Sequence, residues 1–135
     1  RIHYPIKSTS IHSCCIFIVP FNDSFIFFIS KYDIKGNVAM KILRRGRGAG
    51  EYLSSDQFDV DERTGNISVL DIASRKVLIY TASGDFVDEF KIEGVPRDFA
   101  LLDNGDYVLG DLNEYGQHFR IYFYYCFGKS IICIF

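Results

Sequence analysis

The segment GNISVLD at residues 65–71 decides the fold, because GDYVLGD at residues 105–111 repeats its pattern 40 residues later. Each segment begins with glycine beside a polar residue and continues as a short apolar run. Each is followed by another run of aliphatic and aromatic residues, at 77–80 and at 119–122. Such residues favour strands, and glycine beside Asn or Asp favours a tight turn. The sequence therefore predicts repeated all-β units.

Turn residues separate the predicted strands, and no window of a dozen residues has the apolar spacing of a helix. Short turns join consecutive antiparallel strands, which makes a meander rather than a parallel sheet with helical connections. A period of about 40 residues with four short strands is typical of a β-propeller blade. The predicted turns are KGN, TGN, SGD and DNGD, at residues 35–37, 64–66, 83–85 and 103–106.

Five segments occur in a fixed order through the middle of the chain: GRGAGEY (46–52), FDVD (58–61), GNISVLD (65–71), RKVLIY (75–80) and GDF (84–86). This order resembles the NHL-type repeat. More narrowly, it is similar to a bacterial family of six-bladed β-propellers of unknown function, whose members carry GRGxGEY at this place. The resemblance covers about residues 31–122. It implies a propeller fold but little about activity, because propellers host binding, signalling and catalysis alike.

The resemblance also implies a hydrogen bond that is repeated from blade to blade. Asp71 and Asp111 stand at equal places in the two repeats, 40 residues apart. An aspartate at the end of a strand can accept hydrogen bonds from the backbone of the neighbouring turn. We therefore expect these two carboxylates to stabilise their blades.

The chain is long enough for only part of a propeller ring. Its 135 residues make three blades at most, whereas rings have about 4–8 blades. We expect a fragment of two to three blades in an incomplete ring, with open edges that invite self-association. We expect the apolar tail of the chain to be either a truncated or frame-shifted end or an oligomerisation strand. The predicted division is an unmatched segment 1–23, a propeller region 24–125 (partial blade 24–43, full blade 53–92, partial blade 97–125) and an unmatched apolar tail 126–135.

The motifs of common enzymes and metal sites are not matched. The glycine-rich run 46–50 has no Lys-Ser after it and leads into a predicted strand, so it is not a phosphate-binding loop. The acidic stretch from Asp59 has Arg63 and Leu70 where a calcium loop needs ligands. His3, His12 and His118 lie in no nucleophile context. We therefore expect no catalytic residue, no metal and no cofactor, with a propeller-type hydrolase or lyase as the alternative.

The favoured function is a non-catalytic module whose loops bind a protein, a peptide or a glycan. Loop position selects five candidate ligand-binding residues: Arg45, Arg47, Glu51, Tyr52 and Arg97. RNA binding is a further alternative, because some NHL-type propellers bind RNA through basic surfaces with stacking aromatics. The cluster of Arg44, Arg45 and Arg47 beside Tyr52 would supply such a surface. The net charge of -2 disfavours nucleic acid.

The composition is that of a globular protein, with 48% hydrophobic and 24% charged residues. No apolar run reaches the roughly 18 residues of a membrane-spanning helix. The run 11–21 resembles a signal peptide only faintly, because it lacks a small-residue cleavage site. The family resemblance implies the cell envelope or secretion. The cysteines, Cys14, Cys15, Cys126 and Cys133, are expected as buried small hydrophobes, or as a disulfide between the chain ends.

Overall fold

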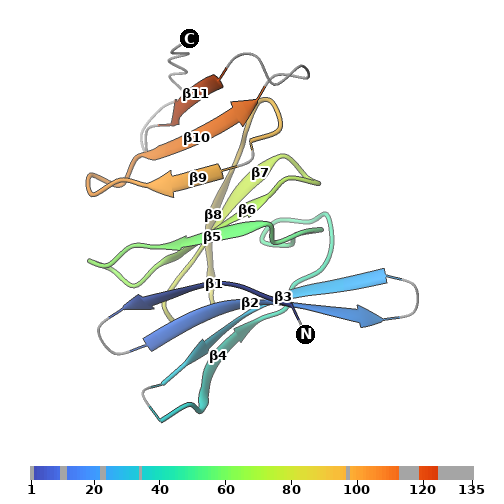
Figure 1. Ribbon diagram of the computed structural model, residues 1–135, viewed down its shortest axis with the longest axis vertical. Helices are drawn as coiled ribbons and strands as arrows, with labels where there is room; N and C mark the ends of the chain where they lie inside the picture. The colour runs from blue at the N-terminus through green and yellow to red at the C-terminus, as the bar shows by residue number, and fades with distance from the viewer. Residues whose placement is uncertain are drawn as a thin grey trace.

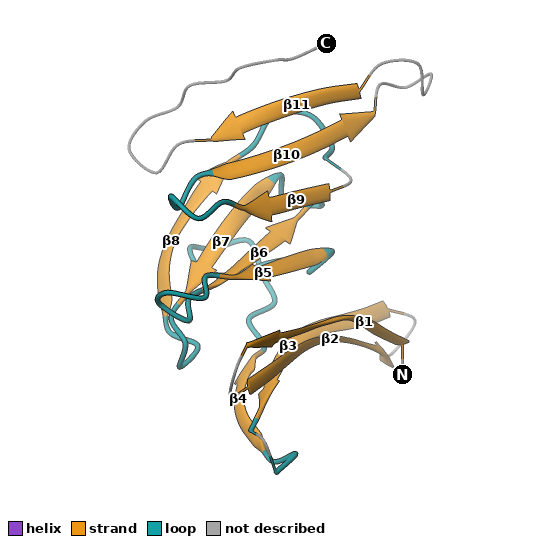
Figure 2. Ribbon diagram, turned by 60° about the vertical axis from the view of Figure 1, so that its left-hand side comes forward, coloured by secondary structure: helices purple, strands orange, loops and turns teal. Residues whose placement is uncertain are grey.

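The protein is a row of three antiparallel sheets, with the second sheet between the other two (Figures 1 and 2). The computed structural model describes residues 2–9, 12–21, 24–33, 35–96, 98–112 and 119–124. The first sheet contains β1 (Ile2–Thr9), β2 (His12–Phe21), β3 (Ser24–Tyr32) and β4 (Val38–Ile42). The second contains β5 (Gln57–Val60), β6 (Ile67–Asp71), β7 (Lys76–Tyr80) and β8 (Phe86–Lys91). The third contains β9 (Asp98–Leu101), β10 (Tyr107–Leu112) and β11 (Phe119–Tyr124).

Each sheet is a meander, because its strands lie side by side in the order of the sequence and every neighbouring pair is antiparallel. The first strand of the second sheet, β5, contacts the first strands of both neighbouring sheets, β1 and β9. The first strands therefore line one side of the row, as the inner strands of propeller blades do. The expectation of an all-β fold made of four-stranded blades in an incomplete ring is confirmed. Among the described residues, no helix has the length and apolar character needed to cross a membrane.

The second sheet is covered on both faces, which explains why every residue of β6 is buried. Successive side chains of a strand point to opposite faces. Ile67 and Val69 belong to the apolar core between the first and second sheets, together with Ile29 and Ile42. Leu70 belongs to the core between the second and third sheets. The strand therefore lacks the strict alternation of apolar and polar residues, and its buried Ser68 is hydrogen-bonded to the hydroxyl of Tyr107 at 2.7 Å.

Polar side chains of β5 join the second blade to the third. The backbone N–H of Phe99 donates to Gln57 Oε1 at 3.3 Å, and the N–H of Leu101 donates to Asp59 Oδ2 at 2.9 Å. Both donors are on β9. The buried carboxylate of Asp59 is thus satisfied by the neighbouring blade, as buried polar groups require.

The hairpin turns have the glycine conformation that the sequence predicts. Gly65 and Gly105, the equivalent glycines of the two repeats, have φ values of 75° and 89°. Only glycine adopts such angles without a steric penalty. The turn prediction is therefore confirmed at both repeats.

The division of the chain into blades stays a prediction. The structure places residues 2–9 and 12–21 in β1 and β2 of the first sheet, upstream of the range 24–43 that the sequence assigned to the first partial blade. The apolar tail, 126–135, lies outside the described residues, as do Cys126, Cys133 and His118.

Candidate functional site

Three connections meet at one end of the sheets: residues 43–56 between β4 and β5, residues 72–75 between β6 and β7, and residues 92–96 after β8. The N–H of Ala73 donates to Ser54 Oγ at 3.3 Å, which joins the first connection to the second. The N–H of Ile92 donates to the carbonyl of Arg75 at 3.0 Å, which joins the second to the third. We call this region the loop end. It contains four of the five residues that the sequence selected as a binding site.

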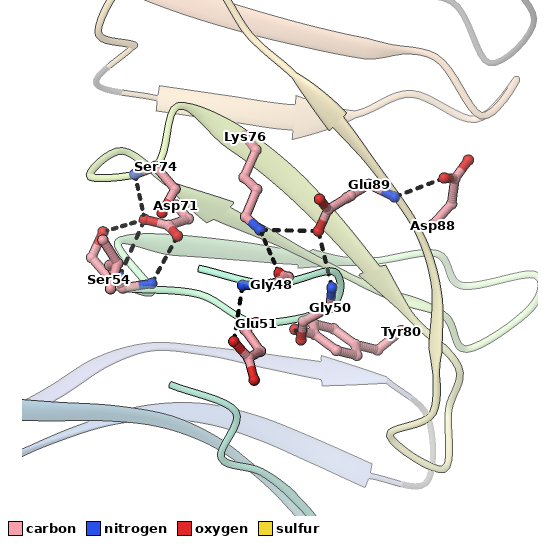
Figure 3. A network of polar contacts seen from close by, with 11 residues as sticks. Gly48, Gly50, Glu51, Ser54, Asp71, Ser74, Lys76, Tyr80, Asp88 and Glu89 are labelled. Atoms are coloured by element: carbon pink, nitrogen blue, oxygen red, sulfur yellow. Dashed lines mark hydrogen bonds and ion pairs between the residues drawn. The ribbon is translucent and has the colours of Figure 1, made fainter. Parts of the chain in front are cut away.

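The glycine-rich run 46–52 is held against β7 and β8 by a polar network (Figure 3). Lys76 Nζ donates to the carbonyl of Gly48 at 3.2 Å and to Glu89 Oε2 at 3.0 Å. The same carboxylate oxygen accepts the N–H of Gly50 at 3.0 Å, and the hydroxyl of Tyr80 donates to the carbonyl of Gly50 at 2.8 Å. The side chain of Lys76 is 8% exposed and that of Glu89 is 30% exposed, so the lysine is largely shielded from solvent where it holds the loop against β7 and β8.

Tyr52 is a core residue. Its ring is 1% exposed and packs in the core between the first and second sheets. Its hydroxyl donates to the carbonyl of Ile42 at 2.8 Å. Burial raises the pKa of this hydroxyl above its ordinary value, so it stays a neutral donor. The structure therefore does not bring the Tyr52 ring to the surface beside the arginines.

Glu51 stabilises its own loop. Its Oε2 accepts the N–H of Gly48 at 2.9 Å. A Cβ added to Gly46 would overlap this same oxygen. The glycine at position 46 is thus explained by the close approach of the Glu51 carboxylate, which is directed into the loop.

Asp71 ends β6 and anchors the connection that leads from the first blade. It is fully buried. Its Oδ2 accepts the N–H of Leu53 at 2.8 Å, and its Oδ1 accepts the N–H groups of Ser54 at 3.2 Å and Ser74 at 3.0 Å, as well as Ser54 Oγ at 2.9 Å. The expected role of Asp71 in its blade is confirmed. For Asp111 the role stays a prediction, because the structure does not describe its side chain.

The arginines of the loop end are exposed. Arg44, Arg45, Arg47 and Arg75 make no ion pair with any described residue. The nearby carboxylates are engaged elsewhere, by backbone N–H groups and by Lys76. Arg45 and Arg47 thus lie together on one exposed loop, as the sequence predicts, while Arg97 lies outside the described residues.

Sequence analysis missed three residues that build this site: Lys76, Glu89 and Ser54. The position of Lys76 in an otherwise apolar run, KVLIY, was the available signal, because a lysine on a buried strand needs a partner. Within the described part of the chain, no group of three or more His, Cys, Asp and Glu side chains is placed to hold a metal ion.

Replacement of Lys76 by Met should lower the free energy of unfolding by about 2 kcal/mol, because the carbonyl of Gly48 and the carboxylate of Glu89 each lose a buried partner. Urea denaturation measures this change. The matched control is Lys91→Met, at an exposed position on β8, where a change within about 0.5 kcal/mol is expected. Equal losses of unfolding free energy in the two variants would show that the polar network around Lys76 does not stabilise the loop.

Comparisons with known proteins identify similar folds. A family described as a six-bladed β-propeller matches residues 4–130. Thirteen chains of solved structures match. One is a "putative exported protein" of Bacteroides fragilis, at 21% identity and a TM-score of 0.58 over 89% of this chain. Another is a protein of unknown function from Bacteroides caccae, at 18% identity and a TM-score of 0.56 over 90% of this chain. This chain spans 42% and 40% of their lengths. No curated protein matches it.

Proposed function

This chain belongs to the family of six-bladed β-propellers, and from that premise we propose that it is a non-catalytic binding module that supplies three blades of a larger ring. Two observations support the number of blades. The described strands form three sheets in a row, and the chain spans 42% and 40% of the two similar solved chains. A ring of six blades needs three more to cover its open faces.

The observation that carries the binding function concerns the charged side chains of the loop end: carboxylates are bound to the loop backbone, whereas arginines are exposed. Glu51 and Asp71 are turned inward and accept hydrogen bonds from the loop backbone. Arg45 and Arg47 are exposed and make no ion pair with described residues. Hydrogen bonds hold the loop backbone, so a ligand need not order the loop on binding. The ligand is a protein, a peptide or a glycan that carries negative charge, while Glu51 and Tyr52 shape the loop.

RNA is supported less well than these ligands. The exposed Arg44, Arg45 and Arg47 could contact phosphates, but the ring of Tyr52 is buried and offers no face for a base to stack upon. Base stacking on aromatic rings supplies much of the affinity for single-stranded RNA.

We place the protein in the cell envelope or outside the cell. The similar chain from Bacteroides fragilis is a "putative exported protein", and this supports the assignment. Immunodetection of the full-length protein in fractionated cells tests it. Recovery of the protein with the cytoplasm alone would refute the assignment.

The binding function is tested by screening peptide and glycan libraries with the full-length protein. A double variant, Arg45→Ala/Arg47→Ala, should bind the selected ligand about 10-fold or more weakly, because exposed arginines are frequent binding hot spots. The matched control is Lys35→Ala/Lys91→Ala, which removes the same charge from exposed positions outside the loop end. Unchanged affinity in the arginine variant would exclude the loop end as the binding surface, and failure of every library would overturn the function.

A further inference from the structure

The two ends of the described blades differ in the charged side chains that they expose. The end opposite the loop end consists of the hairpin turns at 33–37, 61–66, 81–85 and 102–106, and we call it the turn end. Its charged residues, in the part of the chain that the structure describes, are Asp33, Asp61, Glu62, Asp85, Asp103 and Asp106 against Lys35 and Arg63. Those of the loop end, with the residues that bind its backbone, are Arg44, Arg45, Arg47, Arg75 and Lys76 against Glu51, Asp56, Asp71, Glu89 and Glu93, so the two signs balance. All four arginines are exposed, whereas Lys76 and Asp71 are buried and Glu51 and Glu89 are half-buried. The exposed charge of the loop end is therefore mostly positive.

Carboxylates of the loop end are bound to other groups than the exposed arginines. Glu51 is bound to the N–H of Gly48. Asp56 accepts the N–H of Ile72 at 3.0 Å and shares the single proton of the Ser54 hydroxyl with Asp71. A carboxylate that is held by backbone donors is fixed in place and cannot turn toward an exposed guanidinium group. The arginines thus remain available to an anionic partner.

Two large aliphatic side chains are exposed in the same connections. Leu43 is 50% exposed and Val95 is 44% exposed. Leu43 begins the connection that contains the arginines, and Val95 lies in the connection after β8. Leu43 directly precedes Arg44 in the sequence. A surface that carries both arginines and exposed apolar side chains is typical of protein interfaces, where charged groups supply orientation and apolar contact supplies affinity.

We propose that the loop end docks an acidic polypeptide segment that carries apolar side chains among its carboxylates. This inference rests on the proposed binding function and names its ligand. Guanidinium groups bind carboxylates in a bidentate geometry, and aliphatic or aromatic side chains of the partner cover Leu43 and Val95. A polypeptide supplies both kinds of group along one strand, whereas an acidic glycan or a nucleic acid backbone supplies the charge without such side chains.

The test measures binding of four labelled polyanions to the full-length protein by fluorescence anisotropy, at 50 and 150 mM salt. The probes are poly-glutamate, a random glutamate–tyrosine copolymer, polygalacturonate and poly(U), at matched length. The copolymer should bind about 10-fold more tightly than the other three, and more weakly at the higher salt concentration. The variant Arg45→Ala/Arg47→Ala should bind the copolymer about 10-fold more weakly. The control variant Lys35→Ala/Lys91→Ala should bind it with unchanged affinity.

A second variant separates the apolar contribution from the charge. Leu43→Ser/Val95→Ser should remove the preference for the copolymer over poly-glutamate and leave poly-glutamate binding unchanged. Both side chains are exposed, so the variant should unfold at the same urea concentration as the natural protein. A preserved preference in this variant would overturn the inference.

The outcomes also distinguish this inference from the binding function on which it rests. Tightest binding of polygalacturonate would overturn the acidic polypeptide and leave a glycan-binding module in place. Tightest binding of poly(U) would overturn both. Failure of all four probes, together with a ligand found in the library screen, would overturn this inference alone.

Discussion

Replacement of Asp71 by Asn is expected to lower the free energy of unfolding by about 3 kcal/mol, a large part of the 5–15 kcal/mol typical of a domain. Asp71 is fully buried, and its two oxygens accept four hydrogen bonds. An asparagine keeps one acceptor oxygen and replaces the other with an NH₂ group. That NH₂ group would face the N–H of Leu53, and the remaining three bonds would lose the strength that a charged acceptor provides.

The matched control for Asp71 is Asp85→Asn, which makes the same chemical change in a hairpin turn. Asp85 is exposed and accepts one side-chain hydrogen bond, from Ser83 at 3.1 Å. We expect a change within about 0.5 kcal/mol there. Urea denaturation of the full-length protein measures both variants. A loss at position 71 no larger than that at position 85 would contradict the role of Asp71 as the anchor of the connection.

Replacement of Gly50 by Ala is expected to lower the free energy of unfolding by about 3 kcal/mol, through two additive effects. Gly50 has a φ of 72°, and a residue with a side chain pays about 1–2 kcal/mol in this left-handed region. The new Cβ would also lie 2.7 Å from Cγ of Phe86. That ring is packed against the core between the first and second sheets, so relief of the overlap requires movement within a packed region.

Gly36→Ala separates the two costs at Gly50. Gly36 has a φ of 84°, and a Cβ added there would meet nothing within 4 Å. In this variant the free energy of unfolding should fall by about 1 kcal/mol, from the backbone conformation alone. Thermal unfolding of the two variants gives the difference between them. If both lose the same amount, the contact between the loop and Phe86 contributes nothing.

The candidate site was predictable in part, as residues 45 and 52 illustrate. Arg45 follows from the sequence because a charged residue in a glycine-rich connection is ordinarily exposed. Tyr52 lies in the same connection, yet it is buried and its hydroxyl donates to the carbonyl of Ile42. An isolated bridge pairs the two residues, and only Tyr52 faces the core between the first and second sheets. No local pattern distinguishes the two sides of such a bridge.

The strands and their meander order are local consequences of the amino-acid sequence. The 40-residue period and the glycines at positions 65 and 105 set where strands begin and reverse, because turn conformation depends on a few adjacent residues. Contacts between sheets depend instead on which face each strand presents and on segments far apart in the chain. The burial of Tyr52 between the first and second sheets and the position of the 46–52 loop against Lys76 and Glu89 were therefore decided by the tertiary structure.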